Sequence, residues 1–336
     1  MNMMSKSTMI CITGVTALIA VSMVAICVGR VQISFDALFN IIIGNRDQYM
    51  TEWNVMTSLH IPRTLAAILV GMGLSVSGLL YQELFQNKLV SPDFLGVSEG
   101  AGIGAAIAIL AGLSSIFISG FAFVTGIVAV MTAMAISSCF RNRSSFSLLL
   151  SGLIVGGMTA SILSFIKYIV GPETTLAEIE FWLMGSCQNV TMEQIIPLIA
   201  IVITCLTVVM MIKWRVNLIS LGKEECTSRG LSYKKYGILI IVLSTLMTAA
   251  TVAVVGCVSW IGLVIPHIAR VIIGQNTKYT IPTTMLIGGA FMVVADIISR
   301  CFNDSEIPLS AVTGFFGTIF FVIILMSKRG KIDERI

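Results

Sequence analysis

The chain has 336 residues, of which 56% are hydrophobic and 11% charged, and its mean hydropathy is +0.96. A soluble body of this length needs far more polar surface, so the composition excludes a soluble globular protein and indicates an integral membrane protein. The net charge of +4 equals that of one segment, 213–237, which holds six basic and two acidic side chains.

Apolar runs of 15 to 23 residues recur along the chain. A helix of about 20 apolar residues crosses a hydrocarbon core of roughly 30 Å, and backbone groups exposed to lipid must be bonded internally. We therefore predict an all-α polytopic membrane protein with about ten transmembrane helices, forming a single domain over residues 1–336. The predicted spans are 9–29, 61–80, 94–112, 114–136, 148–170, 195–212, 237–258, 259–273, 281–302 and 307–326.

The first run follows Lys6 and has an alternative interpretation as a cleavable signal peptide. Its apolar part is longer than the hydrophobic core of such a signal, and no small-x-small cleavage site stands out before Arg30. We therefore expect a retained span.

The distribution of lysine and arginine predicts the orientation, because cytoplasmic loops are enriched in both. With the N-terminus inside and all ten runs crossing, 16 basic residues lie on the inner side and 5 on the outer side. The eighth run, 259–273, is the shortest; if it failed to cross, the count would become 11 against 10 and the bias would vanish. We therefore predict that both termini and segment 213–237 are cytoplasmic.

On the outer side, the loop 30–59 is long enough to hold a short amphipathic piece, and 171–191 has the pattern of a short helix lying across the outer mouth. His60 and Arg63 come at the start of the second span, where Pro62 suits the first turn of a helix. Snorkelling of Arg63 to the interface is an equally good explanation of its position.

Small residues recur at helical spacing in several of the predicted spans, which favours close approach of helix backbones in lipid. In the fifth span they indicate either a pore wall or a tight helix contact. The residues concerned are Gly71, Ser75 and Gly78 in the second span, Gly96, Gly100 and Gly104 in the third, and Ser151, Gly152 and Gly156 in the fifth.

Near the end of the chain, Pro266 and His267 fall inside the eighth predicted span. The chain has two histidines and no CxxC among its eight cysteines, so a lone His267 is not expected to hold a metal, and we expect a structural or hinge role. Asp296 and Arg300 are four residues apart on one helix face and predict a local ion pair.

Together these residues resemble the permease subunits of bacterial ABC importers for iron chelates, haem and cobalamin, the FecCD or BtuC-like family. The resemblance extends from about residue 29 to 329. Each motif is weak alone, but their order and spacing together are specific. The motifs are 61–67 (IPRTLAA), Ser77-Gly78 with Gln82, 87–89, Ser91-Pro92, Leu95-Gly96 with Gly100-Ala101, Trp182 with Gly185-Ser186, 262–270 (GLVIPHIAR), Asp296 with Arg300, and 306–308 (EIP).

The resemblance implies a bacterial cytoplasmic-membrane permease that works with a second permease subunit, two cytoplasmic ATPase subunits and an extracytoplasmic substrate-binding protein. The chain has no GxxxxGK[ST] phosphate loop, so we expect no cofactor on it, no enzyme activity of its own, and ATP hydrolysis by the partner subunit. In the family the loop at segment 213–237 folds into two short helices that couple to the ATPase. The matching residues are Leu221, Gly222, Arg229, Gly230 and Leu231.

For the outer side, the resemblance implies that arginines hold acidic residues of the binding protein, and Arg63 and Arg300 occupy matching positions. His60 stands where the family usually has a second arginine, so docking is expected to be weaker or to become sensitive to pH near the pKa of histidine. Glu99 replaces a small or amide residue for no reason visible in the sequence. The residues expected along the translocation path or its gates are Ser145, Ser147, Ser151, Gly152, Gly156, Trp182, Gly185, Pro266 and His267.

The expected mechanism is ATP-driven alternating access, with a ferric siderophore as the first expectation for the cargo and haem or cobalamin as alternatives. The sequence leaves open which chelate is carried and whether the pore is a homodimer or a heterodimer. An ion-coupled secondary transporter is the alternative from another class, but it would place acids or basic relays at mid-membrane, whereas Glu99, Lys167 and Asp296 fall toward the ends of the predicted spans. A passive channel would give no role to segment 213–237, and an intramembrane enzyme would need a catalytic constellation that the histidines and cysteines do not form.

Overall fold

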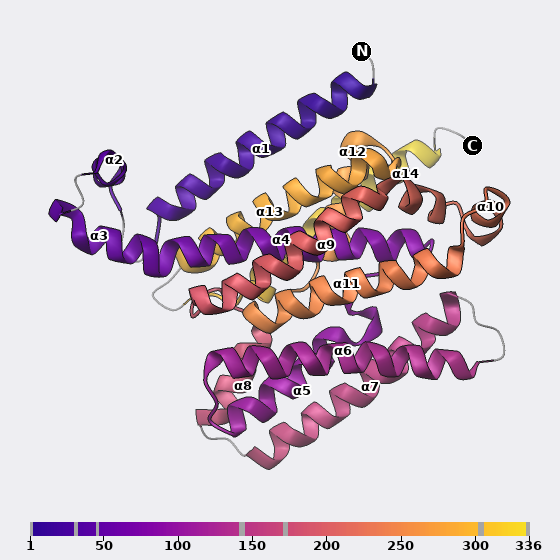
Figure 1. Cartoon of the computed structure of the whole chain (residues 1–336), viewed down its shortest axis with the longest axis horizontal. Helices are drawn as coiled ribbons and strands as arrows, with labels where there is room; N and C mark the ends of the chain where they lie inside the picture. The colour runs from indigo at the N-terminus through magenta and orange to yellow at the C-terminus, as the bar shows by residue number, and fades with distance from the viewer. Residues whose placement is uncertain are drawn as a thin grey trace.

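The computed structural model describes residues 3–29, 33–44, 47–140, 145–170, 174–301 and 306–333, and these residues form helices joined by short connections (Figure 1). The elements are α1 (Met3–Cys27), α2 (Phe35–Ile43), η1 (Asp47–Tyr49), α3 (Met50–Val55), η2 (Met56–His60), α4 (Ile61–Leu84), η3 (Pro92–Leu95), α5 (Val97–Leu110), α6 (Ser115–Cys139), α7 (Ser145–Val170), α8 (Thr174–Met184), α9 (Met192–Ile219), α10 (Lys223–Ser228), α11 (Tyr233–Val255), α12 (Ile261–Ile273), α13 (Thr277–Cys301) and α14 (Leu309–Asp333).

The apolar helices fall on the ten predicted runs. Within the described ranges, seven helices are long and apolar enough to cross a membrane, and three shorter apolar helices cover 97–110, 261–273 and 309–323. The fold class predicted from the sequence is therefore confirmed. Short helices are also present in the outer loops, as α2 in the first and α8 before α9.

Two of the predicted spans are helical over only part of their length. The run 94–112 forms a 3-10 turn followed by α5, which has 14 residues, and the run 259–273 forms α12, which has 13. At 1.5 Å per residue these helices are about 20 Å long, less than the thickness of a hydrocarbon core. Gly96 and Trp260 precede them in the left-handed conformation, with φ of 77° and 72°, and turn the chain into each short helix.

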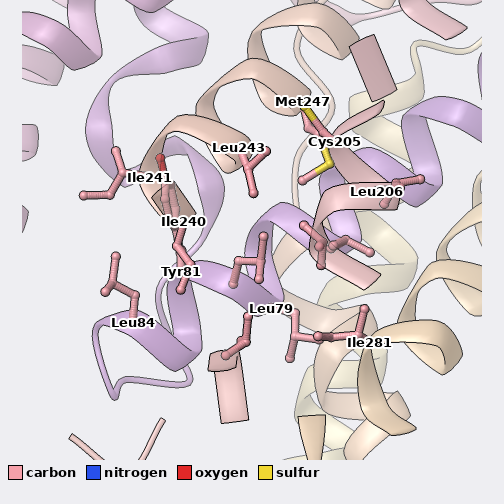
Figure 2. Packing of buried hydrophobic residues seen from close by; sticks show 14 of the residues in the cluster. Leu79, Tyr81, Leu84, Cys205, Leu206, Ile240, Ile241, Leu243, Met247 and Ile281 are labelled. Carbon is pink, nitrogen blue, oxygen red and sulfur yellow. The ribbon is translucent and has the colours of Figure 1, made fainter. Parts of the chain in front are cut away.

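The helix α4 forms the centre of the structure. Pro62 lies in its first turn as predicted, and the π-helical turn Met56–His60 connects it to α3, so that one apolar helical path extends over Met50–Leu84. Buried side chains of α4 pack against α9, α11 and α13 in a continuous apolar core (Figure 2). The labelled residues of that core are Leu79, Tyr81 and Leu84 from α4, Cys205 and Leu206 from α9, Ile240, Ile241, Leu243 and Met247 from α11, and Ile281 from α13.

Glycines allow α4 to approach its neighbours closely, as the small-residue stripe predicts. A Cβ added at Gly71 would lie 2.1 Å from the carbonyl oxygen of Gly288 on α13, and one at Gly78 would lie 1.9 Å from that of Gly262 on α12. Both distances are far below van der Waals contact, so the backbones meet there without side chains between them. This part of the packing depends on the absence of a side chain at either position.

The placement of the ends agrees with the predicted orientation. In Figure 1 the C-terminus and α10 lie at the same end of the long axis, and α1 extends from the N-terminus toward the opposite end, which carries α2, α3 and α8. Five basic residues of the charge count, Arg30, Arg46, Arg141, Arg143 and Arg335, lie outside the described residues.

Candidate functional site

The outer ends of α4, α13 and α14 are joined by an outer ion cluster, which consists of Arg63, Asp296, Arg300 and Glu306. Arg63 donates from Nε to Asp296 Oδ1 at 2.8 Å and from Nη1 and Nη2 to the two carboxylate oxygens of Glu306 at 2.7 and 2.9 Å. Arg300 Nη2 lies 2.8 Å from Asp296 Oδ2, as the predicted local ion pair requires. Two guanidinium groups face two carboxylates, so the cluster is neutral, and its side chains are at most 10% exposed.

This burial changes the interpretation of the two arginines. The prediction placed Arg63 and Arg300 at the outer mouth as anchors for a binding protein, which requires charges that a partner can reach. The residues are 8% and 4% exposed, and carboxylates of the chain itself already neutralise them. Snorkelling of Arg63 is not seen, because its guanidinium group is held by Asp296 and Glu306 instead of extending to water, whereas docking of a binding protein at these residues stays a prediction.

His60 lies beside this cluster and joins α4 to the end of α1. Its ring Nδ1 is 2.6 Å from the carbonyl oxygen of Ile26, and the residue is 6% exposed. Since a carbonyl oxygen only accepts, Nδ1 carries the proton in this contact. A Cβ added at Gly29 would lie 2.8 Å from His60 Nε2 and 3.8 Å from Arg300 Nη1, so the histidine and the arginine border the same small space.

Segment 213–237 is folded more compactly than a solvated loop. α9 continues through Ile219, so the first residues of the segment belong to a long helix, and one short helix, α10, stands between α9 and α11 in this described stretch. The two short helices implied by the resemblance are therefore one separate helix of six residues. Gly222 and Gly230 have φ of 100° and 74°, and they make the turns on either side of α10.

The segment turns one face to the protein and another to water. Cys226 is fully buried and Leu231 packs against the main apolar core, which fixes the segment to the rest of the protein. Leu221 is 48% exposed and the Arg229 side chain 57% exposed, 3.8 Å from Glu225. The exposed residues between them are Lys223, Glu224, Glu225, Thr227 and Ser228. The exposed side is thus charged, with one apolar side chain at its edge.

A second charged cluster, which the sequence analysis did not predict, lies near the cytoplasmic end of α4. Arg270 on α12 donates from Nη1 to Gln82 Oε1 at 2.6 Å and from Nη2 to Glu83 Oε1 at 2.9 Å. Gln82 Nε2 in turn donates to the carbonyl oxygens of Gly262 and Leu263 at 3.3 Å. Gln82 and Arg270 were recognised only as parts of family motifs, and no spacing rule connects residues 188 positions apart.

The predicted path residues of α7 lie against other helices. Ser145 begins α7, and its side chain is outside the described part of the chain. Ser147 and Ser151 are 5% and 0% exposed, and Ser151 donates to the carbonyl oxygen of Ser147. A Cβ on Gly152 would lie 2.1 Å from the carbonyl oxygen of Phe94, whereas nothing lies within 4 Å of one on Gly156. Of the two interpretations of this glycine- and serine-rich stretch, the geometry at Ser151 and Gly152 is that of a tight contact.

The other predicted path residues border the junctions of the short helices. Gly185, with φ of 75°, ends α8, and its carbonyl oxygen accepts from the backbone N–H of Leu309 at the start of α14. Trp182 of α8 is one of the residues that line a cavity of about 210 Å³. His267 is 7% exposed inside α12, next to Pro266, and its ring packs edge-on against Phe321 of α14 with centroids 5.9 Å apart.

Comparison with known proteins assigns the chain to a family. The model of the FecCD transport family matches residues 17–327. The chain belongs to this family. It is 32% identical to the molybdate import permease MolB of Haemophilus influenzae, in an alignment that covers 96% of this chain and 97% of MolB. It is 33% identical to a probable iron chelatin transport permease of Helicobacter pylori, with 82% of this chain and 83% of that protein covered. A solved structure described as an inward-facing ABC transporter of metal-chelate type superposes with a TM-score of 0.87 at 29% identity, over 95% of this chain and 99% of that one.

The assignment fixes the class of protein. The chain is a multi-pass permease subunit of a bacterial binding-protein-dependent ABC importer, and it is not itself the ATPase. An ion-coupled secondary transporter is thereby excluded. Among the described residues, no group of three histidine, cysteine or acidic side chains is placed to hold a metal ion.

Proposed function

We propose that this permease imports a ferric siderophore or a related iron chelate, delivered by an extracytoplasmic binding protein and driven by two ATPase subunits. The observation that carries the proposal is the match to the FecCD family over residues 17–327, together with the similarity to an iron chelatin permease. The apolar exposed face of α7, which includes Leu153, Met158 and Phe165, is compatible with a bulky cargo that is held by shape. A path of this kind needs few polar contacts.

We further propose that segment 213–237 is the contact with the ATPase. Its exposed face presents charged side chains that can set the register of a partner, with Leu221 as an apolar contact at the edge. The buried Cys226 and the packing of Leu231 make the segment part of the permease body, so a displacement by the ATPase would move helices and not only a loop. Alternating access of the cavity between two permease subunits would follow from that movement.

The outer ion cluster supports a docking role of a different kind from that predicted. Arg63 joins α4 to Asp296 of α13 and to Glu306 before α14, and Arg300 pairs with the same Asp296 within α13, so the cluster would shape the surface on which a binding protein rests. A direct bond from Arg63 to an acidic residue of the binding protein would require Glu306 to leave. We therefore propose that the cluster positions the docking surface and that His60 connects this surface to α1.

Molybdate is the second candidate cargo, because the molybdate permease is similar over 96% of this chain. The test is uptake by cells that carry the permease with its ATPase and binding protein, supplied in turn with radiolabelled ferrichrome, haem, cobalamin and molybdate. We expect the ferric chelate to be taken up in a manner that depends on ATP hydrolysis. We also expect the ATPase to copurify with the permease. Uptake of molybdate alone would overturn the iron assignment but not the importer; a permease that never binds an ATPase would overturn the role of segment 213–237.

A further inference from the structure

The end of α4 is capped by a residue that is poorly suited to the position. Gln86 has φ of 50°, a left-handed conformation that glycine adopts without strain and glutamine rarely does. Its backbone N–H donates to the carbonyl oxygen of Glu83 at 3.4 Å, and that of Asn87 donates to the carbonyl oxygen of Gln82 at 3.2 Å. This pair of bonds is a Schellman motif with Gln86 at the position that is usually glycine. The cap alone would be better made by glycine, so the side chain requires another explanation.

The side chain of Gln86 reaches into the turn that begins the exposed part of segment 213–237. Its Nε2 donates to the carbonyl oxygen of Ser220 at 3.3 Å. A Cβ added at Gly222 would lie 2.7 Å from the same Nε2, so the amide occupies the space beside that glycine. The left-handed residue that ends α4 and the left-handed glycine that precedes α10 are therefore interlocked.

The same end of α4 is bonded to two further elements. Tyr233, the first residue of α11, donates from its hydroxyl group to the carbonyl oxygen of Leu84 at 2.9 Å. Glu83 pairs with Arg270 of α12 at 2.9 Å. The last turn of α4 thus contacts segment 213–237 on both sides of α10 and is fastened to α12 by a partly buried ion pair. A displacement of the turn at Ser220 has a direct route through Gln86 to α4 and α12.

We propose that Gln86 is a positioning residue that passes the movement of segment 213–237 to α4 and α12, and that its strained backbone is retained for this contact. The inference rests on the proposed function, in which that segment meets the ATPase. Gln86 lies in the turn that follows α4, is itself exposed, and contacts segment 213–237 through the carbonyl oxygen of Ser220.

The test distinguishes the effect of the left-handed backbone at Gln86 from the effect of its side-chain amide. Gln86→Gly relieves the left-handed strain and removes the amide, Gln86→Glu keeps the length but replaces the donor by an acceptor, and Gln86→Lys keeps a donor of similar reach. Lys88→Ala is the matched control, because Lys88 lies in the same turn but bonds Gln275 in the connection between α12 and α13, at 3.0 Å. The complete transporter, with its ATPase and binding protein, is reconstituted in vesicles, and thermal unfolding, ATP hydrolysis and uptake of the four radiolabelled cargoes are measured.

For Gln86→Gly we expect unfolding at the parental temperature or above. The number of cargo molecules imported per ATP hydrolysed should fall by about fivefold or more. Gln86→Glu should show the same loss, whereas Gln86→Lys and Lys88→Ala should stay near the parental ratio. A parental ratio in Gln86→Gly, or equal losses in Gln86→Gly and Gln86→Lys, would overturn the role of the side chain. A parental transporter that hydrolyses no ATP and takes up no cargo would instead refute the proposed function, and the inference with it.

Discussion

Replacing Asp296 by asparagine tests whether the outer ion cluster depends on its charge balance. The Asp296 side chain is fully buried, accepts from Arg63 at 2.8 Å and lies 2.8 Å from Arg300. Asparagine fills the same volume but leaves two guanidinium groups to share Glu306, so the cluster goes from neutral to a net charge of +1. Breaking a buried pair from one side costs about 3–5 kcal/mol, because the remaining charge is uncompensated. We therefore expect the free energy of unfolding of Asp296→Asn to fall by about that amount.

The double variant Asp296→Asn with Arg300→Met provides the decisive comparison. It restores neutrality and keeps the bidentate pair of Arg63 and Glu306, so it should be more stable than Asp296→Asn alone, with a coupling of about 1–3 kcal/mol. Unfolding free energies in lipid nanodiscs, measured by denaturant or by steric trapping, give all terms of the cycle. A loss below about 1 kcal/mol for the single variant, which is the value for exposed pairs, would refute the argument from burial. Strictly additive losses in the double variant would refute the argument from charge balance.

Two further substitutions test the packing and the coupling surface. Gly71→Val places a side chain where a Cβ already meets the carbonyl oxygen of Gly288 at 2.1 Å, so we expect a loss of about 1–3 kcal/mol in unfolding free energy, whereas Gly157→Ala, with nothing within 4 Å, should be neutral. The second test compares two variants with a single cysteine each, one that keeps only Cys226 and one that carries only Thr227→Cys. Cys226 should react with maleimide about tenfold more slowly, because burial raises the pKa of its thiol and blocks access to it. Equal labelling rates would show that α10 does not pack on its Cys226 face, and a fully stable Gly71→Val protein would show that α4 and α13 do not cross there.

The sequence predicts the helices well because their signal is local. Ten apolar runs, the short outer helices and the proline in the first turn of α4 all follow from composition and spacing within a window of about 20 residues. What local hydropathy misses is where an apolar run is helical. The residues around Gly96 and Trp260 are apolar enough to belong to a span, but their left-handed backbone interrupts it, so α5 and α12 are shorter than the runs that contain them.

The candidate site was predicted less well, because its contacts connect distant parts of the chain. The pair of Asp296 and Arg300 was found from its four-residue spacing, and the turns at Gly222 and Gly230 from their glycines. The bond of Arg63 to Glu306 spans 243 positions and cannot be read from spacing. The docking role of Arg63 and Arg300 came from the family resemblance, which does not indicate that the chain supplies its own carboxylates to both. A charged residue next to an apolar run indicates a partner without indicating which one.

The two charged clusters together constrain which helices can move. At its outer end α4 is bonded to α13 and to the start of α14 through Arg63, and at its inner end to α12 through Glu83. Between these ends its backbone touches α13 at Gly71 and α12 at Gly78 without intervening side chains. Sliding α4 along either neighbour would break the buried bonds of Arg63 at the outer end, at about 3–5 kcal/mol, and the partly buried pair of Glu83 and Arg270 at the inner end. Helices α4, α12 and α13 therefore form one rigid body, and the changes that open one side of the pore must be taken up where this body meets the remaining helices or a second subunit.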